Sequence, residues 1–172
     1  GGSDLVDLFD KRPLTVMIGY SFRFYPPLQL IHLALQRGDI GIHFFFRAEV
    51  GQYLPDWRPD MDYRDCVSAN AHLGGGAVLE LSHELDYARW LMGEVVQVQA
   101  HLGYSGIIDV DVEDTVDINV QFAGGHSGQI HLDMLQRPPS RLCKIAGSAG
   151  TLDWNGITHQ VRLFQTAVGE WV

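Results

Sequence analysis

Cysteine is scarce in this sequence, which has only Cys66 and Cys143 among 172 residues. Two cysteines are too few for the disulfide framework of a small secreted domain, and they do not form the paired spacing of a zinc site. We therefore expect two buried free thiols and a cytoplasmic, reducing location.

Long apolar runs and positive charge are also in short supply. No apolar stretch approaches the ~18 residues that a membrane-spanning helix needs. Twelve Lys and Arg residues stand against 21 Asp and Glu, so the net charge is −9, which disfavours nucleic acid and anionic membranes as partners. Hydrophobic residues still make up 46% of the chain, enough to bury a sizeable core.

The first twenty residues have the pattern of the end of a different domain. Residues 4–10 resemble the last part of a helix, and residues 14–20 (LTVMIGY) form the apolar run of a strand buried on both faces of a parallel sheet. One helix and one strand cannot make a sheet alone. We expect residues 1–20 to be the remnant of a dinucleotide-binding domain and residues 21–172 to form a second domain.

The second domain has the pattern of an α+β fold. A helix is expected from Pro26 to Gln36, ended by Gly38, followed by a strand over 42–50 whose inward residues include Phe44. Further strands should form a mostly antiparallel, open-faced sheet with helices on one face. These strands are expected at residues 95–102, 114–122, 130–134, 141–146, 151–154 and 160–164.

The two faces of this sheet should differ in character. Alternation places Val96, Val98, Ala100 and Leu102 inward. The outward residues are polar but mostly uncharged, which suits a face covered by a second copy of the chain, although a solvated face remains open as an alternative. These outward residues are Gln97, Gln99, Asn119, Gln121, Gln129 and His131.

A glycine-led segment, LGGGAVLELSHELDYARWLMG (73–93), carries the densest set of functional groups. We expect one continuous helix with an apolar stripe against the sheet and an opposite face turned to a cleft or solvent. The stripe comprises Val78, Leu81, Leu85, Ala88 and Met92, and the opposite face comprises Glu80, His83, Glu84 and Tyr87.

On that face Glu80 and His83 are spaced i,i+3, so their side chains can meet. A carboxylate beside an imidazole raises its pKa and orients it, which suits a proton acceptor. The glycines would let a ligand approach closely, with free N–H groups at the helix start. A merely solvated face is the plain alternative, and a metal site from Glu80, His83 and Asp86 lacks a second histidine at metalloprotease spacing.

Three stretches resemble one protein family. GGGAVLELSHELDYARWLMGEV is similar to the glycine-led helix signature of the glucose–fructose oxidoreductase/inositol dehydrogenase (Gfo/Idh/MocA) family. VMIGYSFRFYPPLQ resembles the segment that joins its two domains, and FRAEVGQYLPDWRPDMDYR looks like a loop of members close to sugar-nucleotide enzymes. Their order and spacing also agree.

The resemblance implies an NAD(P)-dependent oxidoreductase of sugars, inositols or sugar nucleotides. In that family an N-terminal Rossmann domain binds the cofactor, and a lysine from an E-K-P motif works with an aspartate and a histidine of the glycine-led helix. Carried over, the catalytic residues are His83 and Glu80. The substrate-binding residues are Arg23, Tyr53, Trp57, Gly75, Gly76 and Tyr87, and Tyr20 and Ser21 lie at the nicotinamide edge.

The chain departs from the family pattern in three respects. Glu80 stands where the family has aspartate, Ser21 where asparagine is usual, and the chain has no G-x-G-x-x-G strand–helix unit or E-K-P lysine. We therefore expect an inactive fragment that binds neither NAD nor NADP by itself. Two alternatives stay open: a non-catalytic binding or assembly module, and a metal-assisted lyase or isomerase using His83, Glu84 and Asp86.

Overall fold

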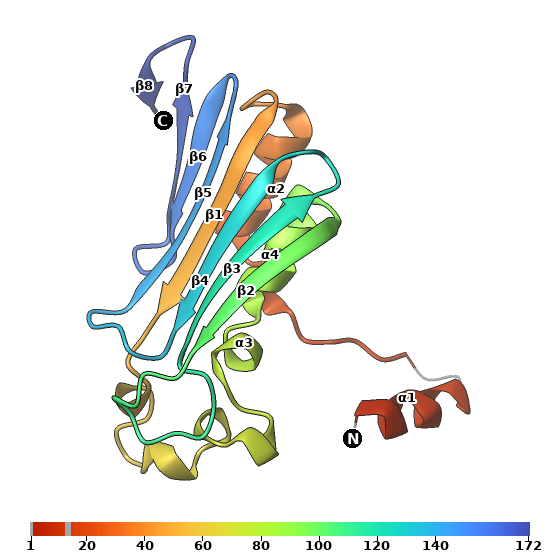
Figure 1. The fold of residues 1–172 in the computed structure, drawn as a ribbon. Helices are drawn as coiled ribbons and strands as arrows, with labels where there is room; N and C mark the ends of the chain where they lie inside the picture. Colours follow the sequence, from red (N-terminus) through yellow and green to blue (C-terminus); the bar gives the residue numbers. More distant parts are fainter. Residues whose placement is uncertain (1, 13–14) are drawn as a thin grey trace.

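A computed structural model describes residues 2–12 and 15–172. Within these residues eight strands form one sheet in the order β2-β3-β4-β1-β5-β6-β7-β8, and helices α2 and α4 lie against one of its faces (Figure 1). The helices are α1 Gly2–Asp10, α2 Pro26–Arg37, α3 Ala77–Glu80 and α4 His83–Met92. The strands are β1 His43–Gly51, β2 Val95–Gly103, β3 Thr115–Phe122, β4 Ser127–Asp133, β5 Ser140–Gly147, β6 Gly150–Asn155, β7 Gln160–Gln165 and β8 Glu170–Trp171.

Neighbouring strands pair antiparallel except at one place in the middle of the sheet. Strand β1 lies parallel to β4 and antiparallel to β5, so a strand from early in the domain is inserted between two later ones. Among the described residues no helix lies against the other face (Figure 1). The expected α+β class, with helices on one face of an open sheet, is confirmed.

The first twenty residues agree only in part with the prediction. Helix α1 covers the expected residues 4–10, but residues 15–20 run as unpaired chain, with Met17 and Ile18 exposed, and Leu14 lies outside the described residues. A strand requires a neighbour for its N–H and C=O groups, and no described strand lies beside this segment. The strand predicted over residues 14–20 is therefore not formed in the described part. No described helix is long and apolar enough to cross a bilayer.

Helix α2 and strand β1 follow the predicted pattern with one exception. Gly38 ends α2 with a φ of 75°, a left-handed conformation that glycine adopts without strain. In β1, Phe46, Ala48 and Val50 are buried, but Phe44 is exposed. The pairing of β1 with β5 shifts register between His43 and Phe45, so the alternation is broken there and the inward prediction for Phe44 is wrong.

Strand β2 differs more from the prediction. Val96, Val98 and Leu102 are 65%, 60% and 45% exposed, and Ala100 is exposed as well. Val98 and Leu102 pair with Val120 and Val116, so they do lie on the helix-covered side of the sheet. Because β2 is the edge strand, the helices do not cover it (Figure 1).

The glycine-led segment is not one helix. α3 ends at Glu80 and α4 begins at His83, and between them Leu81 leaves the helical region with φ −103° and ψ 25°. The turn rotates α4 relative to the predicted continuous helix. Its buried residues are Glu84, Tyr87, Ala88, Leu91 and Met92, an i, i+3, i+4, i+7, i+8 stripe that starts on a carboxylate. The predicted exposure of Glu84 and Tyr87 is therefore wrong.

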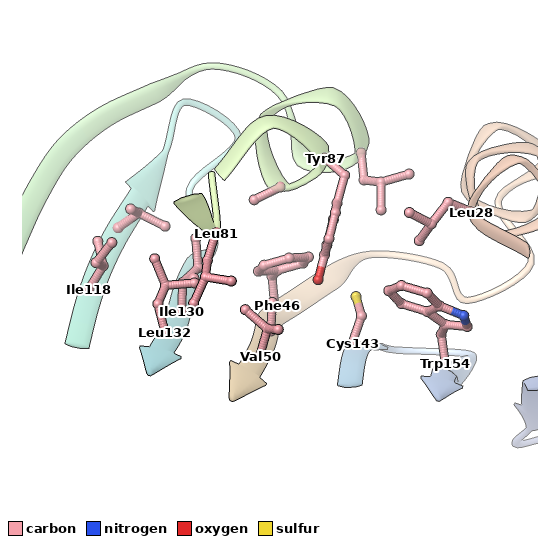
Figure 2. Close-up of a cluster of buried hydrophobic side chains, with 14 of the residues drawn as sticks. Leu28, Phe46, Val50, Leu81, Tyr87, Ile118, Ile130, Leu132, Cys143 and Trp154 are labelled. Atoms are coloured by element: carbon pink, nitrogen blue, oxygen red, sulfur yellow. The ribbon is translucent and has the colours of Figure 1, made fainter. Parts of the chain in front are cut away.

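Tyr87 lies at the centre of the core. Figure 2 shows its ring extending from α4 toward the sheet, between Phe46 and Trp154. The ring centroids lie 6.1 Å from Phe46 and 6.0 Å from Trp154, both in edge-on arrangements that favour aromatic packing. The Tyr87 hydroxyl is fully buried and has no hydrogen-bond partner among the described residues.

Of the three glycines before α3, Gly75 and Gly76 are packed closely, and Gly74 takes a left-handed conformation with a φ of 86°. A Cβ at Gly75 would lie 2.2 Å from the Val67 carbonyl oxygen, so only glycine lets the two backbones touch. The N–H groups of Gly74, Gly75 and Gly76 all donate to carbonyls of the preceding turns. The next two, of Ala77 and Val78, donate to the backbone and the carboxylate of Glu113. The N–H groups of residues 74–78, which were predicted to be free for a ligand, are therefore all engaged within the protein.

We predict that Tyr87→Phe raises the free energy of unfolding by about 1 kcal/mol, because it removes a buried hydroxyl that lacks a partner. Tyr63→Phe is the matched control, since the Tyr63 hydroxyl accepts a hydrogen bond from the Asp109 N–H and its loss should lower stability slightly. Urea unfolding of both variants measures the difference. A loss of stability in Tyr87→Phe would contradict the absence of a partner.

We also predict that Gly75→Ala lowers the free energy of unfolding by about 1–3 kcal/mol, the usual cost of forcing an extra carbon into a packed site. Gly19→Ala is the control, because a Cβ there meets nothing within 4 Å and its stability should be unchanged or slightly raised. Thermal unfolding compares the two, and equal melting temperatures would show that the turn at Val67 gives way.

Candidate functional site

His83, at the first position of α4, is held by aromatic residues of the segment before α2. Phe22 stacks on the imidazole with centroids 4.8 Å apart, and Tyr20 meets it edge-on at 5.8 Å. Both belong to the stretch in which Ser21–Phe24 forms a 3₁₀ turn. Tyr20 and His83, predicted to lie at one site, are therefore brought together, while Ser21 is exposed beside them.

The surroundings of His83 favour its neutral form. Partial burial lowers its pKa below the ordinary value, and the positive charge of Arg141 lowers it further, while Asp86 acts in the opposite sense. Its Nδ1 is buried and has no hydrogen-bond partner among the described residues. A neutral imidazole at pH 7 can accept a proton, so the environment suits that role.

Glu80 does not contact His83 in this structure. Its carboxylate accepts a hydrogen bond of 2.8 Å from the Ser68 hydroxyl, and the turn at Leu81 separates it from the α4 face that carries His83. The i,i+3 pairing predicted for these two residues required an unbroken helix. Glu80 instead lines a cleft with Trp57 and Arg141, near the end of β1.

Arg23 is held by α4. Its guanidinium forms a two-pronged ion pair with Asp86, with a shortest distance of 2.7 Å, and the Asp86 side chain is nearly buried. Two parallel hydrogen bonds fix orientation as well as distance. The pair ties the segment before α2 to the helix that carries His83, so Arg23 stands close to the predicted site with part of its surface exposed.

Tyr53 and Trp57 have different positions in the loop after β1. Tyr53 packs beneath Arg137, whose guanidinium lies 3.6 Å from the ring centroid and pairs with Asp56. The Trp57 indole N–H donates to the Gln52 carbonyl at 3.0 Å, and its ring lines the Glu80 cleft. Trp57 therefore lines the cleft, whereas Tyr53 packs against Arg137 and stabilises the loop.

Gly75, Gly76 and Tyr87 are not arranged as ligand-contacting groups. The glycines pack against Val67 and Glu113, and the Tyr87 side chain is fully buried. The N–H groups of Gly74, Gly75 and Gly76 donate to backbone carbonyls, and the Gly124–Gly125 turn only joins β3 to β4, so neither glycine-rich segment has the form of a phosphate-binding loop. Substrate-binding roles for Gly75, Gly76 and Tyr87 stay a prediction.

Sequence reasoning missed a buried ion pair beneath His83. Glu84 of α4 is 0% exposed, and its carboxylate oxygen lies 2.9 Å from Nε of Arg141, the second residue of β5. Burial raises the pKa of Glu84 to about 7, and Arg141 opposes that rise. The Arg141 guanidinium also lies 4.8 Å from the Phe22 ring centroid. No sequence signal joins two residues 57 positions apart in different elements.

Both carboxylates of the metal alternative are engaged in ion pairs with arginines. Glu84 pairs with Arg141, and Asp86 pairs with Arg23. The described residues contain no group of three or more His, Cys, Asp or Glu side chains able to hold a metal ion. The geometry therefore gives no support to a metal-assisted lyase or isomerase built on His83, Glu84 and Asp86.

The open face of the sheet forms a second candidate surface. A shallow hollow there is lined by charges of both signs, among them Arg47, Glu49 and Lys144. His131 lies between Asp117, at 2.7 Å, and Asp133, at 3.4 Å. Hydrogen bonds to these carboxylates raise the pKa of His131 to about 9, so it is protonated at neutral pH.

Solved structures with the same fold come from longer oxidoreductases. An NAD-binding oxidoreductase from Klebsiella pneumoniae is 20% identical with a TM-score of 0.80, and the match covers 95% of this chain and 46% of that one. The WlbA dehydrogenase from Bordetella pertussis, in complex with NADH and UDP-GlcNAcA, is 24% identical with a TM-score of 0.80, covering 93% and 50%. Levoglucosan dehydrogenase in complex with NADH and levoglucosan is 22% identical with a TM-score of 0.79, covering 92% and 45%.

At these identities the likeness shows the fold, and this chain spans about half the length of each relative. A search of curated proteins found no match. The family model described as the GFO/IDH/MocA C-terminal domain matches residues 28–153, well over half of the chain. The chain therefore belongs to the GFO/IDH/MocA C-terminal domain family, as its motifs indicated.

Proposed function

We propose that this chain is the substrate-binding and assembly domain of an NAD(P)-dependent oxidoreductase acting on a hydroxyl or keto group of a sugar, an inositol or a sugar nucleotide. The family membership supports this, as do the sugar or sugar-nucleotide ligands named for two structural relatives. The observation that carries the proposal is His83, whose surroundings favour its neutral form and whose ring stacks on Phe22 in the segment before α2.

In this proposal His83 takes the proton of a substrate hydroxyl. The nicotinamide cofactor, when bound, would accept or return a hydride at the carbon that bears this hydroxyl. His83 can hold the proton because its imidazole enters the reaction neutral, and Asp86 lies close enough to stabilise the charged form by its own negative charge. Phe22 and Tyr20 fix the imidazole plane, so the proton acceptor is positioned before substrate arrives.

Glu80 is assigned to the substrate and not to His83. It lines the cleft with Trp57, and one of its oxygens is already oriented by the Ser68 hydroxyl. A carboxylate held in this way accepts hydrogen bonds from sugar hydroxyls. Arg23 is kept in place by Asp86 and would border the substrate.

The described residues do not by themselves fit a whole dinucleotide. Tyr20 and exposed Ser21 could meet only the nicotinamide edge, and no described loop holds the phosphates. We therefore propose that another part of the full-length protein binds NAD or NADP. The chain alone should turn over no substrate. Two buried free thiols, Cys66 and Cys143, fit a reducing compartment such as the cytoplasm.

One observation favours the second candidate, a non-catalytic binding module of the same fold. Glu80 makes no contact with His83, so the predicted carboxylate–imidazole pair is missing. In that case the aromatic setting of His83 would serve packing alone. Kinetic analysis of His83 variants in the full-length protein separates the two functions.

We predict that His83→Asn in the full-length enzyme lowers kcat by roughly 10²–10⁴-fold, the usual contribution of a positioned acid–base group. Stability should change little, because the buried stripe of α4 is untouched. His101→Asn is the control, since His101 is exposed on the edge strand β2 and should leave kcat unchanged. Normal turnover with a lowered melting temperature in His83→Asn would favour the packing role.

We also propose self-association through the open sheet face, which is polar, hollowed and lined by charges of both signs. The protein should sediment as a dimer or a larger closed oligomer. Gln129→Arg, near the middle of this face, should shift it toward monomer, because a symmetric interface repeats the new charge in both copies. Gln36→Arg on exposed α2 should not. A wild-type protein that stays monomeric at high concentration would rule out this interface.

A further inference from the structure

Arg141 is placed in the Glu80 cleft by three separate supports. Gly156 lies beneath its aliphatic part, where a Cβ would come within 2.8 Å of the Arg141 Cγ. The Phe22 ring lies 4.8 Å from the guanidinium carbon. Glu84, from inside the core, pairs with the Nε side of the guanidinium at 2.9 Å. These contacts hold the long Arg141 side chain in one conformation and so lower the entropy cost of binding a ligand to it.

The guanidinium is only partly enclosed by these contacts. The Arg141 side chain keeps 23% of its surface exposed, and it lines the cleft beside Glu80, Trp57 and Ser140. Among the residues lining this cleft, Arg141 carries the positive charge and Glu80 the negative one. An arginine has five N–H donors in a planar fork, and Glu84 takes the side that faces the core.

Glu84 also compensates the charge of Arg141 incompletely. Although Glu84 Oε1 and Arg141 Nε are 2.9 Å apart, neither atom has a well-aligned hydrogen-bond partner among the described residues, and the hydrogen bond from Arg141 Nη2 to Glu84 Oε2 is long at 3.4 Å. Burial also raises the pKa of Glu84, which disfavours its charged form. Burial lowers the pKa of His83, and the positive charge of Arg141 lowers it further. The cleft thus presents a pre-oriented cation that lacks a full counter-charge.

We infer that Arg141 binds an anionic oxygen group of the substrate, a carboxylate or a phosphate, and so selects acidic sugars or sugar phosphates over neutral sugars. This rests on the proposed function, because it takes the Glu80 cleft as the substrate site. The planar guanidinium matches the oxygens of a carboxylate or phosphate in a two-pronged hydrogen bond. Glu80 at the same cleft would accept from hydroxyl groups of the same ligand.

The binding test uses D-glucose, D-glucuronate and glucose 1-phosphate, which share a sugar ring and differ in the charged group. Calorimetry should give binding of at least one anionic ligand that is roughly 10–100-fold tighter than binding of glucose, the range expected for hydrogen bonds to a charged group. Comparing glucuronate with the phosphate ester identifies which oxyanion the cleft accepts. Equal affinity for all three ligands, or none for either anion near its solubility limit, would overturn the inference.

The variants separate binding by Arg141 from a purely structural role. Arg141→Gln alone leaves buried Glu84 without its partner and is expected to be unstable, so the double variant Arg141→Gln/Glu84→Gln is used to remove both charges. Anion binding should be lost in the double variant, yet kept or tightened in Glu84→Gln, which frees the cation. Arg37→Gln, an exposed arginine paired with Asp39, removes the same charge elsewhere and should bind like wild type. Wild-type affinity in the double variant would overturn the inference.

A second readout follows the imidazole of His83 by NMR. Arg141 lowers the pKa of His83, so an anion bound at Arg141 should raise that pKa, and the double variant should show a raised pKa without any ligand. An anion that binds without changing the pKa of His83 binds at another site, and this result would contradict the assignment of Arg141 as the anion-binding residue. Neither readout requires turnover, so failure of the proposed oxidoreductase activity would leave both results interpretable.

Discussion

The positions of His83, Arg23 and Arg141 depend on how α4 lies against the sheet, and that packing places the Glu84 carboxylate in the core. Burying a carboxylate is costly, and removing the partner of a buried ion pair commonly destabilises a protein by about 3–5 kcal/mol. The helix must therefore take the rotation that brings Glu84 to Arg141 of β5. The same rotation buries Tyr87 against Phe46 of β1 and Trp154 of β6, and it leaves His83 only partly buried.

Phe22 joins this helix to the rest of the site. It contacts His83 and Tyr87 of α4 and Trp154 of β6, and its ring also faces Arg141. One aromatic side chain from the segment before α2 therefore meets the candidate proton acceptor, the core and the candidate anion-binding arginine. Aromatic pairs add about 0.5–1.5 kcal/mol beyond the burial of their area, so this arrangement also anchors the segment that leads into the domain.

Sequence patterns predicted the features that depend on residues close together in the chain. Period-two alternation located the later strands to within a few residues, and Gly38 marked the end of α2, because both depend on neighbours along the chain. The insertion of β1 between β4 and β5 depends on contacts between distant residues, which no alternation encodes. The turn at Leu81 was not predicted because apolar residues continue at helical spacing across it. The pairing of Glu84 with Arg141 was not predicted because it forms only when α4 packs against the sheet.

The Glu80 cleft and the hollow of the open face lie on opposite faces of one sheet, and strand β5 contributes residues to both. In β5, Arg141, Cys143 and Ile145 alternate with Leu142 and Lys144, which line the hollow of the open face. A shift of one residue in pairing would turn Arg141 away from Glu84 and bring Lys144 against the helices. The burial of Glu84 opposes such a shift, since its carboxylate would lose its partner. The ion pair that orients the cleft therefore also keeps the polar face pointing outward.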